Sequence, residues 1–340
     1  MRKFTGFEKG INFGGWFSQC DNTEKTYDTF ITDEDFVKVR DWGLDHVRIP
    51  VDYNLVQNLD GSFKEEGFAR LGRCIDMCEK LGLNMVLDLH KAIGYSFDAG
   101  ENEDGFFEDE KYQEYFYSLW DEFAKRFGNR KNLAFELLNE VTKYEYKDIW
   151  NSIALKAIER IRKYAPEIKI LVGGYYNNSV TAVKDLIMPV DENIVYNFHC
   201  YNPLIFTHQG AYWIPSMDTN FRMKFTSTNR EYQKNTAEQI KGYMYEQFPD
   251  NDEVIDVTYF EKLFAEAIRV CEERDVALYC GEYGVIELAN TEDVLDWYRC
   301  IHSVFEKHGI SRAAWSYRKM DFDLEGSKYD EVREEFISLL

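Results

Sequence analysis

The sequence has no uninterrupted apolar run of about 20 residues, the length that an α-helix needs to cross a bilayer. We therefore expect no membrane-spanning segment. Residues 1–9 are basic, but they lack the apolar core of a secretory signal peptide. We expect a cytoplasmic protein, or a secreted one whose signal peptide is absent from this chain.

An excess of positive charge is also missing. The chain has 40 Lys and Arg residues against 61 Asp and Glu residues, and its formal net charge is −21. Affinity for nucleic acid that is independent of sequence comes from Lys and Arg side chains that neutralise phosphates. Nucleic acid, anionic membranes and acidic polymers are therefore disfavoured as partners, whereas an uncharged sugar is compatible with this surface.

Linkers and low-complexity segments are absent, and the 7 cysteines form no disulfide framework. They are odd in number and fall in strand-like and helix-like segments. Cys74 and Cys78, for example, lie one helical turn apart in an apolar pattern. Buried reduced thiols are the ordinary interpretation of such positions. We expect a single domain over residues 1–340 with reduced cysteines, which favours an intracellular location.

What recurs along the chain is a short apolar run, a polar loop and a longer segment with helical spacing. Near-continuous apolar runs are typical of strands that are buried on both faces. The runs are residues 10–14, 46–50, 85–90, 133–138, 170–173, 194–199, 277–281 and 313–317. Eight strands alternating with helices predict an α/β fold, the closed (β/α)₈ barrel. The alternative, an open doubly wound sheet, normally carries a Gly-rich phosphate loop after its first strand, and Gly14-Gly15-Trp16 is not such a loop.

One connection, residues 202–256, is far longer than a usual barrel loop. It has some helical spacing of its own and precedes a helix expected to begin near Val257. We predict that residues 202–256 form a small subdomain over the C-terminal ends of the strands. The alternative is a disordered surface excursion, which the high aromatic content of the segment disfavours. Its rings are Phe206, Tyr212, Trp213, Phe221, Tyr232, Tyr243 and Tyr245.

Polar side chains gather at the predicted C-terminal ends of the strands, which is where a barrel of this kind builds its active site. Two carboxylates that face each other across the barrel mouth are what glycosidic bond cleavage requires. One protonates the leaving oxygen, and the other attacks or activates water. The set therefore predicts a glycoside hydrolase in which Glu140 and Glu282 are the catalytic pair. The residues at these ends are Arg48, His90, Asn139, Glu140, His199, Tyr201, Glu282 and Trp315.

Other chemistries match the sequence less well. A metal-dependent barrel hydrolase needs several His and Asp residues at ligand spacing, whereas only His90 and His199 fall at strand ends. Neither a Gly-x-Ser-x-Gly elbow nor a Gly-x-x-x-x-Gly-Lys phosphate loop is present. We expect Cys280 to be structural, and Glu136 to form an internal salt bridge with Arg48. No metal and no cofactor is implied, since carboxyl groups and water suffice for both half-reactions.

Several of these segments together resemble glycoside hydrolase family 5, the cellulase family of clan A. Residues 135–140 (FELLNE) are similar to the family's Asn-Glu motif on the fourth strand, and residues 279–284 (YCGEYG) to its nucleophile strand. Further matches follow the chain in order, at residues 10–16, 46–50, 87–90, 196–201 and 313–317. The resemblance covers the whole chain. It implies a (β/α)₈ barrel that cleaves β-1,4-linked or mixed-linkage β-glucans.

The resemblance also implies roles. Glu140 would be the acid/base and Glu282 the nucleophile, with net retention, and Asn139 would hydrogen-bond the sugar 2-hydroxyl. The remaining residues would serve these three: Arg48 and Tyr201 would donate to Glu282, His90 and His199 would bind hydroxyls and tune Glu140, and Trp315 would form the floor under the sugar.

This sequence departs from the family pattern at two places. Cys200 stands where we expect an aromatic residue, and residues 91–95 replace a loop in which relatives often carry a second His or a Pro. These departures leave the outer subsites and the linkage preference open.

Retention predicts a separation of about 5–5.5 Å between the Glu140 and Glu282 carboxyl groups. We expect Glu282 to stay ionised beside Arg48 and Tyr201, and the pKa of Glu140 to be raised by the second carboxylate opposite it. The expected partner is a neutral β-glucan or gluco-oligosaccharide, bound by a monomer. Two alternatives stay open: an exo-acting β-glucosidase or exo-β-1,3-glucanase, and a non-catalytic sugar-binding barrel.

Overall fold

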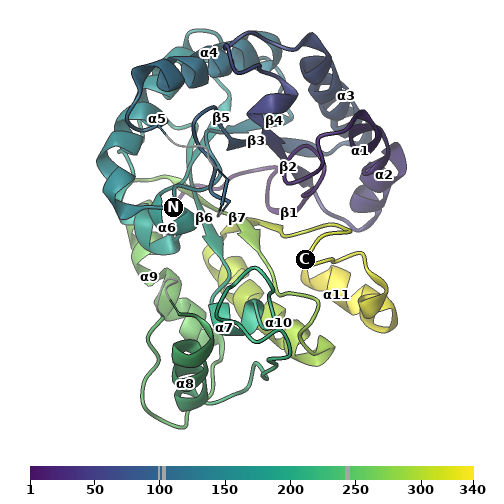
Figure 1. The fold of residues 1–340 in the computed structure, drawn as a ribbon, viewed down its shortest axis with the longest axis vertical. Coiled ribbons are helices and arrows are strands. Elements are labelled where there is room, and N and C mark those ends of the chain that lie inside the picture. Colours follow the sequence, from purple (N-terminus) through teal and green to yellow (C-terminus); the bar gives the residue numbers. More distant parts are fainter. Residues whose placement is uncertain (99, 102–104, 242–245) are drawn as a thin grey trace.

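The computed structural model describes residues 1–98, 100–101, 105–241 and 246–340. Its centre is a closed barrel of parallel strands in the order β1 to β8, so the predicted (β/α)₈ fold is confirmed (Figure 1). The strands are β1 (Lys9–Asn12), β2 (His46–Asp52), β3 (Asn84–Lys91), β4 (Leu133–Glu136), β5 (Lys169–Val172), β6 (Ile194–Cys200), β7 (Ala277–Tyr283) and β8 (Ser311–Ala314).

Every predicted run overlaps a strand, but four runs extend past the strand's end. Residues 13–14 lie beyond β1, residues 137–138 beyond β4, residue 173 beyond β5 and residues 315–317 beyond β8. The apolar pattern continues there because these residues stay buried after they leave the ladder. Glu140 and Trp315 are consequently held on the loops of the barrel mouth, not on the strands.

Helices cover the outside of the barrel in Figure 1. The helix expected near Val257 begins at that residue, and Thr32 and Asp35 form the capping box of α2, which satisfies backbone donors of its first turn. The α-helices are α1 (Glu24–Thr29), α2 (Asp33–Asp41), α3 (Glu65–Leu81), α4 (Glu110–Phe127), α5 (Lys147–Arg162), α6 (Tyr175–Asn178), α7 (Leu204–Thr207), α8 (Asn229–Gln239), α9 (Val257–Glu273), α10 (Thr291–His308) and α11 (Arg333–Leu339).

The barrel interior changes from apolar to polar along its axis. At the N-terminal end, Phe4 and Phe7 stack with ring centroids 4.3 Å apart and pack in one cluster with inward-facing residues such as Val86 and Leu171. Nearer the C-terminal ends of the strands, the interior side chains are charged or polar, and Arg48 and Glu136 are fully buried among them. The apolar layer closes one end, so the polar groups face the other.

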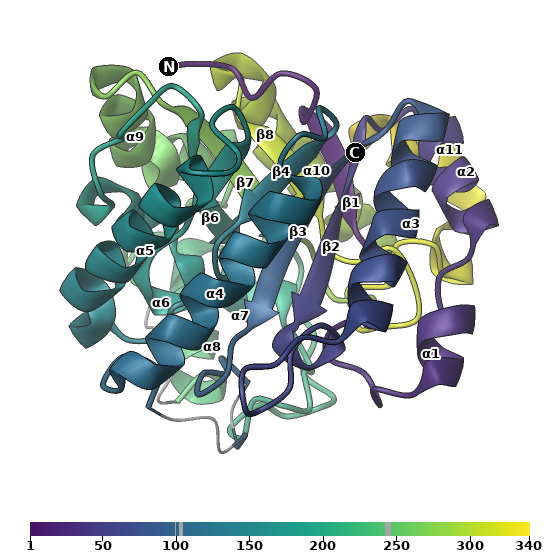
Figure 2. The same ribbon diagram turned by 90° about the horizontal axis from the view of Figure 1, so that it is seen from above.

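Residues 202–256 lie between β6 and α9 and contain α7 and α8. In Figure 2, α7 and α8 lie toward the end of the barrel to which the arrowheads of β2 and β3 point, opposite the N-terminus. Phe206 and Tyr232 are fully buried, and the Tyr232 ring lies 5.2 Å from that of Phe248. Part of the segment is therefore packed through aromatic side chains, whereas Tyr212 is exposed. Tyr243 and Tyr245 lie outside the described residues.

All seven cysteines are free, as predicted, and Cys74 and Cys78 are buried on the inner face of α3. Within the described ranges, no helix combines the length and the apolar character that crossing a bilayer requires.

Candidate active site

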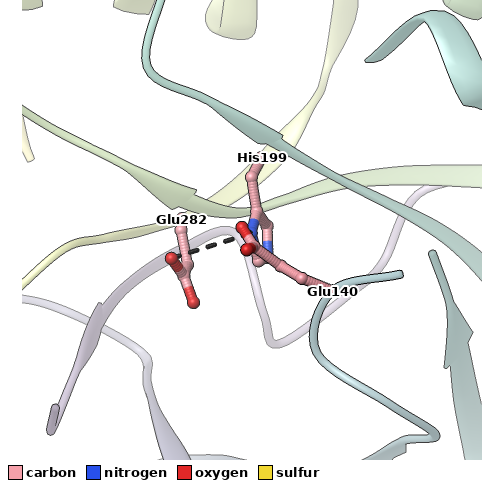
Figure 3. A group of neighbouring side chains, drawn as sticks. All are labelled: Glu140, His199 and Glu282. Atoms are coloured by element: carbon pink, nitrogen blue, oxygen red, sulfur yellow. Dashed lines mark hydrogen bonds and ion pairs between the residues drawn. The ribbon is translucent and has the colours of Figure 1, made fainter. Parts of the chain in front are cut away.

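The two predicted catalytic acids face each other at the barrel mouth, with His199 beside them (Figure 3). Glu282 lies in β7, His199 lies in β6, and Glu140 lies on the loop after β4. One carboxylate oxygen of each acid and one ring nitrogen of His199 all lie within 4.8 Å of one another. All three side chains are buried, so charge interactions among them are screened little by water.

Two side chains hold the Glu140 carboxyl. His199 Nδ1 lies 2.8 Å from Oε1, and Asn177 Nδ2 donates to Oε2 at 2.8 Å. The pKa of Glu140 is raised to about 7, and burial is the largest cause. The direction agrees with the prediction, but the cause that we predicted, the opposing carboxylate, is not among the principal ones. Desolvation disfavours the charged form even without a second negative charge.

His199 is a neutral imidazole over most of the pH range. Burial lowers the pKa of His199 to about 4. Its Nδ1 lies 2.8 Å from Glu140 and 3.6 Å from Glu282, so the predicted contact with Glu140 is present. Because the ring is uncharged, it can donate a hydrogen bond to Glu140 without placing a positive charge between the acids.

Glu282 is held by donors at both oxygens. Arg48 Nη1 donates to Oε1 at 2.8 Å, and the Tyr201 hydroxyl donates to Oε2 at 2.9 Å. Both predicted donors are therefore in place. A guanidinium and a hydroxyl at these distances fix the orientation of the carboxyl group.

Arg48 joins Glu282 to a buried polar network. Its Nε and Nη2 donate to the two Glu136 oxygens at 2.6 and 2.8 Å, which confirms the predicted salt bridge. Nη2 also lies 3.0 Å from Asp88 Oδ2 and donates to Asn139 Oδ1 at 2.7 Å. Burial raises the pKa values of Asp88 and Glu136 to about 7. One guanidinium thus fixes the positions of the nucleophile candidate and of the asparagine beside Glu140.

Replacement of Arg48 by Lys should lower the free energy of unfolding by about 3–5 kcal/mol, because a single ammonium leaves buried carboxylates without a partner. Urea unfolding measures the change. Arg299→Lys is the matched control. Arg299 also pairs with three acids, but its side chain on α10 is 38% exposed, so this replacement should cost about 1 kcal/mol or less. Equal losses in the two variants would contradict the network's importance.

His90 and Trp315 form a second part of the site. Their rings are parallel, with centroids 5.9 Å apart, and Phe97 packs edge-on against His90 at 4.9 Å. His90 Nδ1 pairs with Asp88, whereas His199 Nδ1 pairs with Glu140. Trp315 needs a glycine opposite it, since a Cβ at Gly14 would approach the indole to 2.9 Å.

Sequence reasoning missed two asparagines. Asn177 contacts Glu140 directly, and its left-handed backbone (φ 54°) is a conformation that Asn adopts more readily than most residues. The Asn177-Asn178 pair after the fifth strand was the available signal. Asn12 accepts from Arg48 Nη1 at 2.9 Å through Oδ1 and donates to the Gly281 carbonyl through Nδ2. Its place inside the first strand was the only hint.

The geometry favours acid–base chemistry over metal binding. Glu140, His199 and Glu282 are close enough to share an ion, but the Arg48 guanidinium already lies 2.8 Å from Glu282 and would repel a cation. Cys280 is buried in β7, and burial raises the pKa of its thiol well above the usual range, so it is a poor source of thiolate. Its structural interpretation agrees with this environment.

Known proteins place the chain in a family. The family model described as cellulase (glycosyl hydrolase family 5) matches residues 7–321. Cellodextrinase A from Ruminococcus flavefaciens is 48% identical over 320 residues, which cover 94% of this chain and 88% of that protein. Endoglucanase C from Acetivibrio thermocellus is 37% identical over 342 residues, with 98% of each chain covered.

A solved endoglucanase structure from Thermotoga maritima has the same fold, with a TM-score of 0.75 and 24% identity over 98% of this chain and 97% of that one. The family model and the two relatives together show the family. The chain therefore belongs to the cellulase family, glycosyl hydrolase family 5, and is a glycoside hydrolase of the cellulase type.

Proposed function

We propose that the chain hydrolyses β-1,4-linked or mixed-linkage β-glucan and its oligosaccharides by double displacement, with Glu140 as acid/base and Glu282 as nucleophile. One observation carries this assignment. Two buried carboxyl groups face each other, with an oxygen of one within 4.8 Å of an oxygen of the other, and their hydrogen-bond partners differ. Inverting enzymes keep their carboxyls about 6.5–9.5 Å apart to admit a water, so this spacing supports retention.

In the first step, Glu282 attacks the anomeric carbon while Glu140 gives its proton to the leaving oxygen. The C–O bond breaks, and an ester forms between the sugar and Glu282. Glu140 is suited to this role because the pKa of its carboxyl is raised to about 7, which keeps it protonated in weakly acidic solution. Arg48 and Tyr201 each donate a hydrogen bond to Glu282 and fix its orientation toward the sugar.

In the second step, Glu140 is ionised and acts as the base. It takes a proton from water, the resulting hydroxide oxygen bonds to the anomeric carbon, and the ester bond to Glu282 breaks. His199 Nδ1–H and Asn177 Nδ2–H stabilise the Glu140 carboxylate during this interval, since both donors lie 2.8 Å from its oxygens. Both acids return to their starting protonation states.

The other predicted residues fit sugar binding. Asn139 Oδ1 accepts a hydrogen bond from Arg48, so the Asn139 NH₂ group is left to donate to a 2-hydroxyl, a contact that strengthens toward the transition state. Trp315 and His90 offer a flat face at the mouth. An uncharged glucan agrees with the net charge of −21, which would repel an acidic polymer.

One relative is called a cellodextrinase and the other an endoglucanase. Both names support a glucan substrate, and the chain length of that substrate is a matter for experiment. We propose endo cleavage. A product time course on barley β-glucan, cello-oligosaccharides and laminarin tests it, with mixed oligosaccharides expected early from barley β-glucan. Glucose as the sole product from the start would replace the endo proposal by the exo-acting alternative.

The pH profile should reflect Glu140. Because the pKa of this acid is raised to about 7 and only its protonated form can act as the acid, kcat/KM for cello-oligosaccharides should fall as the pH rises through about 7. With a dinitrophenyl cellobioside, whose leaving group needs no proton, kcat/KM should fall much less over the same alkaline range. The measurement is kcat/KM on both substrates over about two pH units either side of 7.

Replacement of Asn177 should shift the pH at which kcat/KM falls. The hydrogen bond from Asn177 lowers the pKa of Glu140, so in Asn177→Ala the alkaline limb of the pH profile should move to higher pH. Glu145→Ala, which removes an exposed acid on the same connection after β4, should leave the limb unchanged. A limb that is identical in the Asn177 variant and in the parent would argue against Glu140 as its origin.

A further inference from the structure

Glu140 lies beyond the regular part of the barrel. β4 ends at Glu136, and the chain after it keeps only isolated backbone contacts to the neighbouring strands, such as Asn139 N to Leu89 O at 3.1 Å. A side chain that must meet a leaving oxygen needs a fixed backbone beneath it, since small misplacements cost large factors in rate. The backbone of Glu140 therefore needs support from outside β4.

The Tyr95 hydroxyl holds this backbone. Tyr95 Oη donates to the carbonyl oxygen of Glu140 at 2.6 Å and accepts from the backbone N–H of Thr142 at 3.0 Å. It thereby bridges the two peptide groups that flank Val141, in place of the partner strand that β4 no longer has. Tyr95 is 5% exposed, so water competes little for these groups.

The Tyr95 ring is itself fixed from two sides. Residues 92–95 form a tight turn directly after β3, in which Tyr95 N donates to Ala92 O at 2.9 Å and Gly94 takes a left-handed conformation (φ +80°). Behind the ring, Phe107 packs edge-on at 5.2 Å and stacks in turn on Tyr146, which immediately precedes α5. The hydroxyl is thus positioned by both β3 and the start of α5.

We propose that Tyr95 is a positioning residue for the acid/base: its hydroxyl sets the backbone from which the Glu140 carboxyl reaches the leaving oxygen. It touches neither substrate nor the reacting atoms. This inference rests on the proposed role of Glu140, and it predicts an effect on the acid-assisted step in particular. Loss of the hydroxyl should lower kcat/KM most for substrates whose leaving group must be protonated.

The test compares two leaving groups. Tyr95→Phe keeps the ring and removes the hydroxyl. We expect kcat/KM on cellotetraose to fall about tenfold or more, while kcat/KM on 2,4-dinitrophenyl cellobioside changes about threefold or less. The ratio of the two rate constants is the readout, because a general loss of folded enzyme lowers both alike. Equal losses on both substrates, or no loss on either, would overturn the proposal.

Two further variants keep the result interpretable. Tyr232→Phe removes a hydroxyl that is just as buried and donates to the Phe225 carbonyl at 2.9 Å in the 202–256 segment, and it should leave the ratio unchanged. If Tyr95→Phe does not fold, Phe107→Leu loosens the packing behind the ring and should shift the ratio in the same direction by less. An unshifted ratio in that variant would also overturn the proposal.

Glu140→Ala serves as the benchmark in the same assay. If it fails to discriminate between the two leaving groups, the role proposed for Glu140 is wrong. If it discriminates and Tyr95→Phe does not, only the role proposed for Tyr95 is wrong.

Discussion

Replacement of Glu282 by Ala should lower kcat/KM on the order of 10⁴-fold or more, on cello-oligosaccharides and on dinitrophenyl cellobioside alike. Without the carboxylate no ester can form, and a better leaving group does not substitute for a missing nucleophile. The Arg48 and Tyr201 donors that hold both Glu282 oxygens would face an empty position. Initial rates on both substrates, with circular dichroism to confirm folding, measure the effect.

Azide sharpens this experiment. In the space left by Glu282, azide can attack the face of the sugar that the carboxylate attacked, in a single displacement, so the glycosyl azide should have the inverted α configuration. A β-glycosyl azide from this variant would contradict the assignment of Glu282 as nucleophile.

Glu140→Ala should give the second-largest effect, with a different pattern. We expect kcat/KM on cello-oligosaccharides to fall about 10²–10⁴-fold, since a sugar leaving group needs the proton that Glu140 supplies. Slow turnover of dinitrophenyl cellobioside should persist, because that leaving group departs unprotonated. The two measurements are kcat/KM on each substrate and the burst of dinitrophenol when the second step becomes limiting.

Azide should accelerate the Glu140 variant by attacking the ester at Glu282, and the product should be the retained β-glycosyl azide. An inverted product here would mean that the two carboxylates have exchanged roles. Glu145 is an exposed acid nearby in sequence, and the Glu145→Ala variant should have the kcat/KM of the parent on both substrates.

Much of the barrel could be predicted from the sequence because each strand is buried on both faces and reads as a short apolar run. The eight runs all meet strands, since in a closed parallel barrel helices cover the outer face and side chains fill the inner one. The predicted runs extended past the strands at β1, β4, β5 and β8. There the chain leaves the ladder while its side chains remain buried, so apolar character continues past the last strand residue.

The site was predictable where a residue type has few alternative explanations. A Glu or His at a strand end, and an Arg inside a strand, are costly to bury, so their positions carried information. Asn177 and Tyr95 were not predictable in the same way. Asn is common in loops, and a buried Tyr is common in a core. Only the structure reveals that Asn177 contacts the Glu140 carboxyl and that Tyr95 contacts the Glu140 backbone.

The cause of the raised Glu140 pKa was also beyond the sequence. The pattern showed two acids that should meet, and like-charge repulsion was the simplest reason for a shift. In the structure, desolvation of Glu140 is instead the largest cause of the raised pKa, and it depends on how the surrounding loops pack against this side chain.

The most direct test of the double-displacement account is to trap its intermediate. A 2-deoxy-2-fluoro cellobioside with a good leaving group forms the glycosyl ester quickly and hydrolyses it slowly, because the fluorine destabilises both transition states. Mass spectrometry of the inactivated protein should show one added glycosyl unit, and peptide mapping should place it on Glu282. A label on Glu140, or complete turnover with an inverted sugar product and no label, would contradict the account.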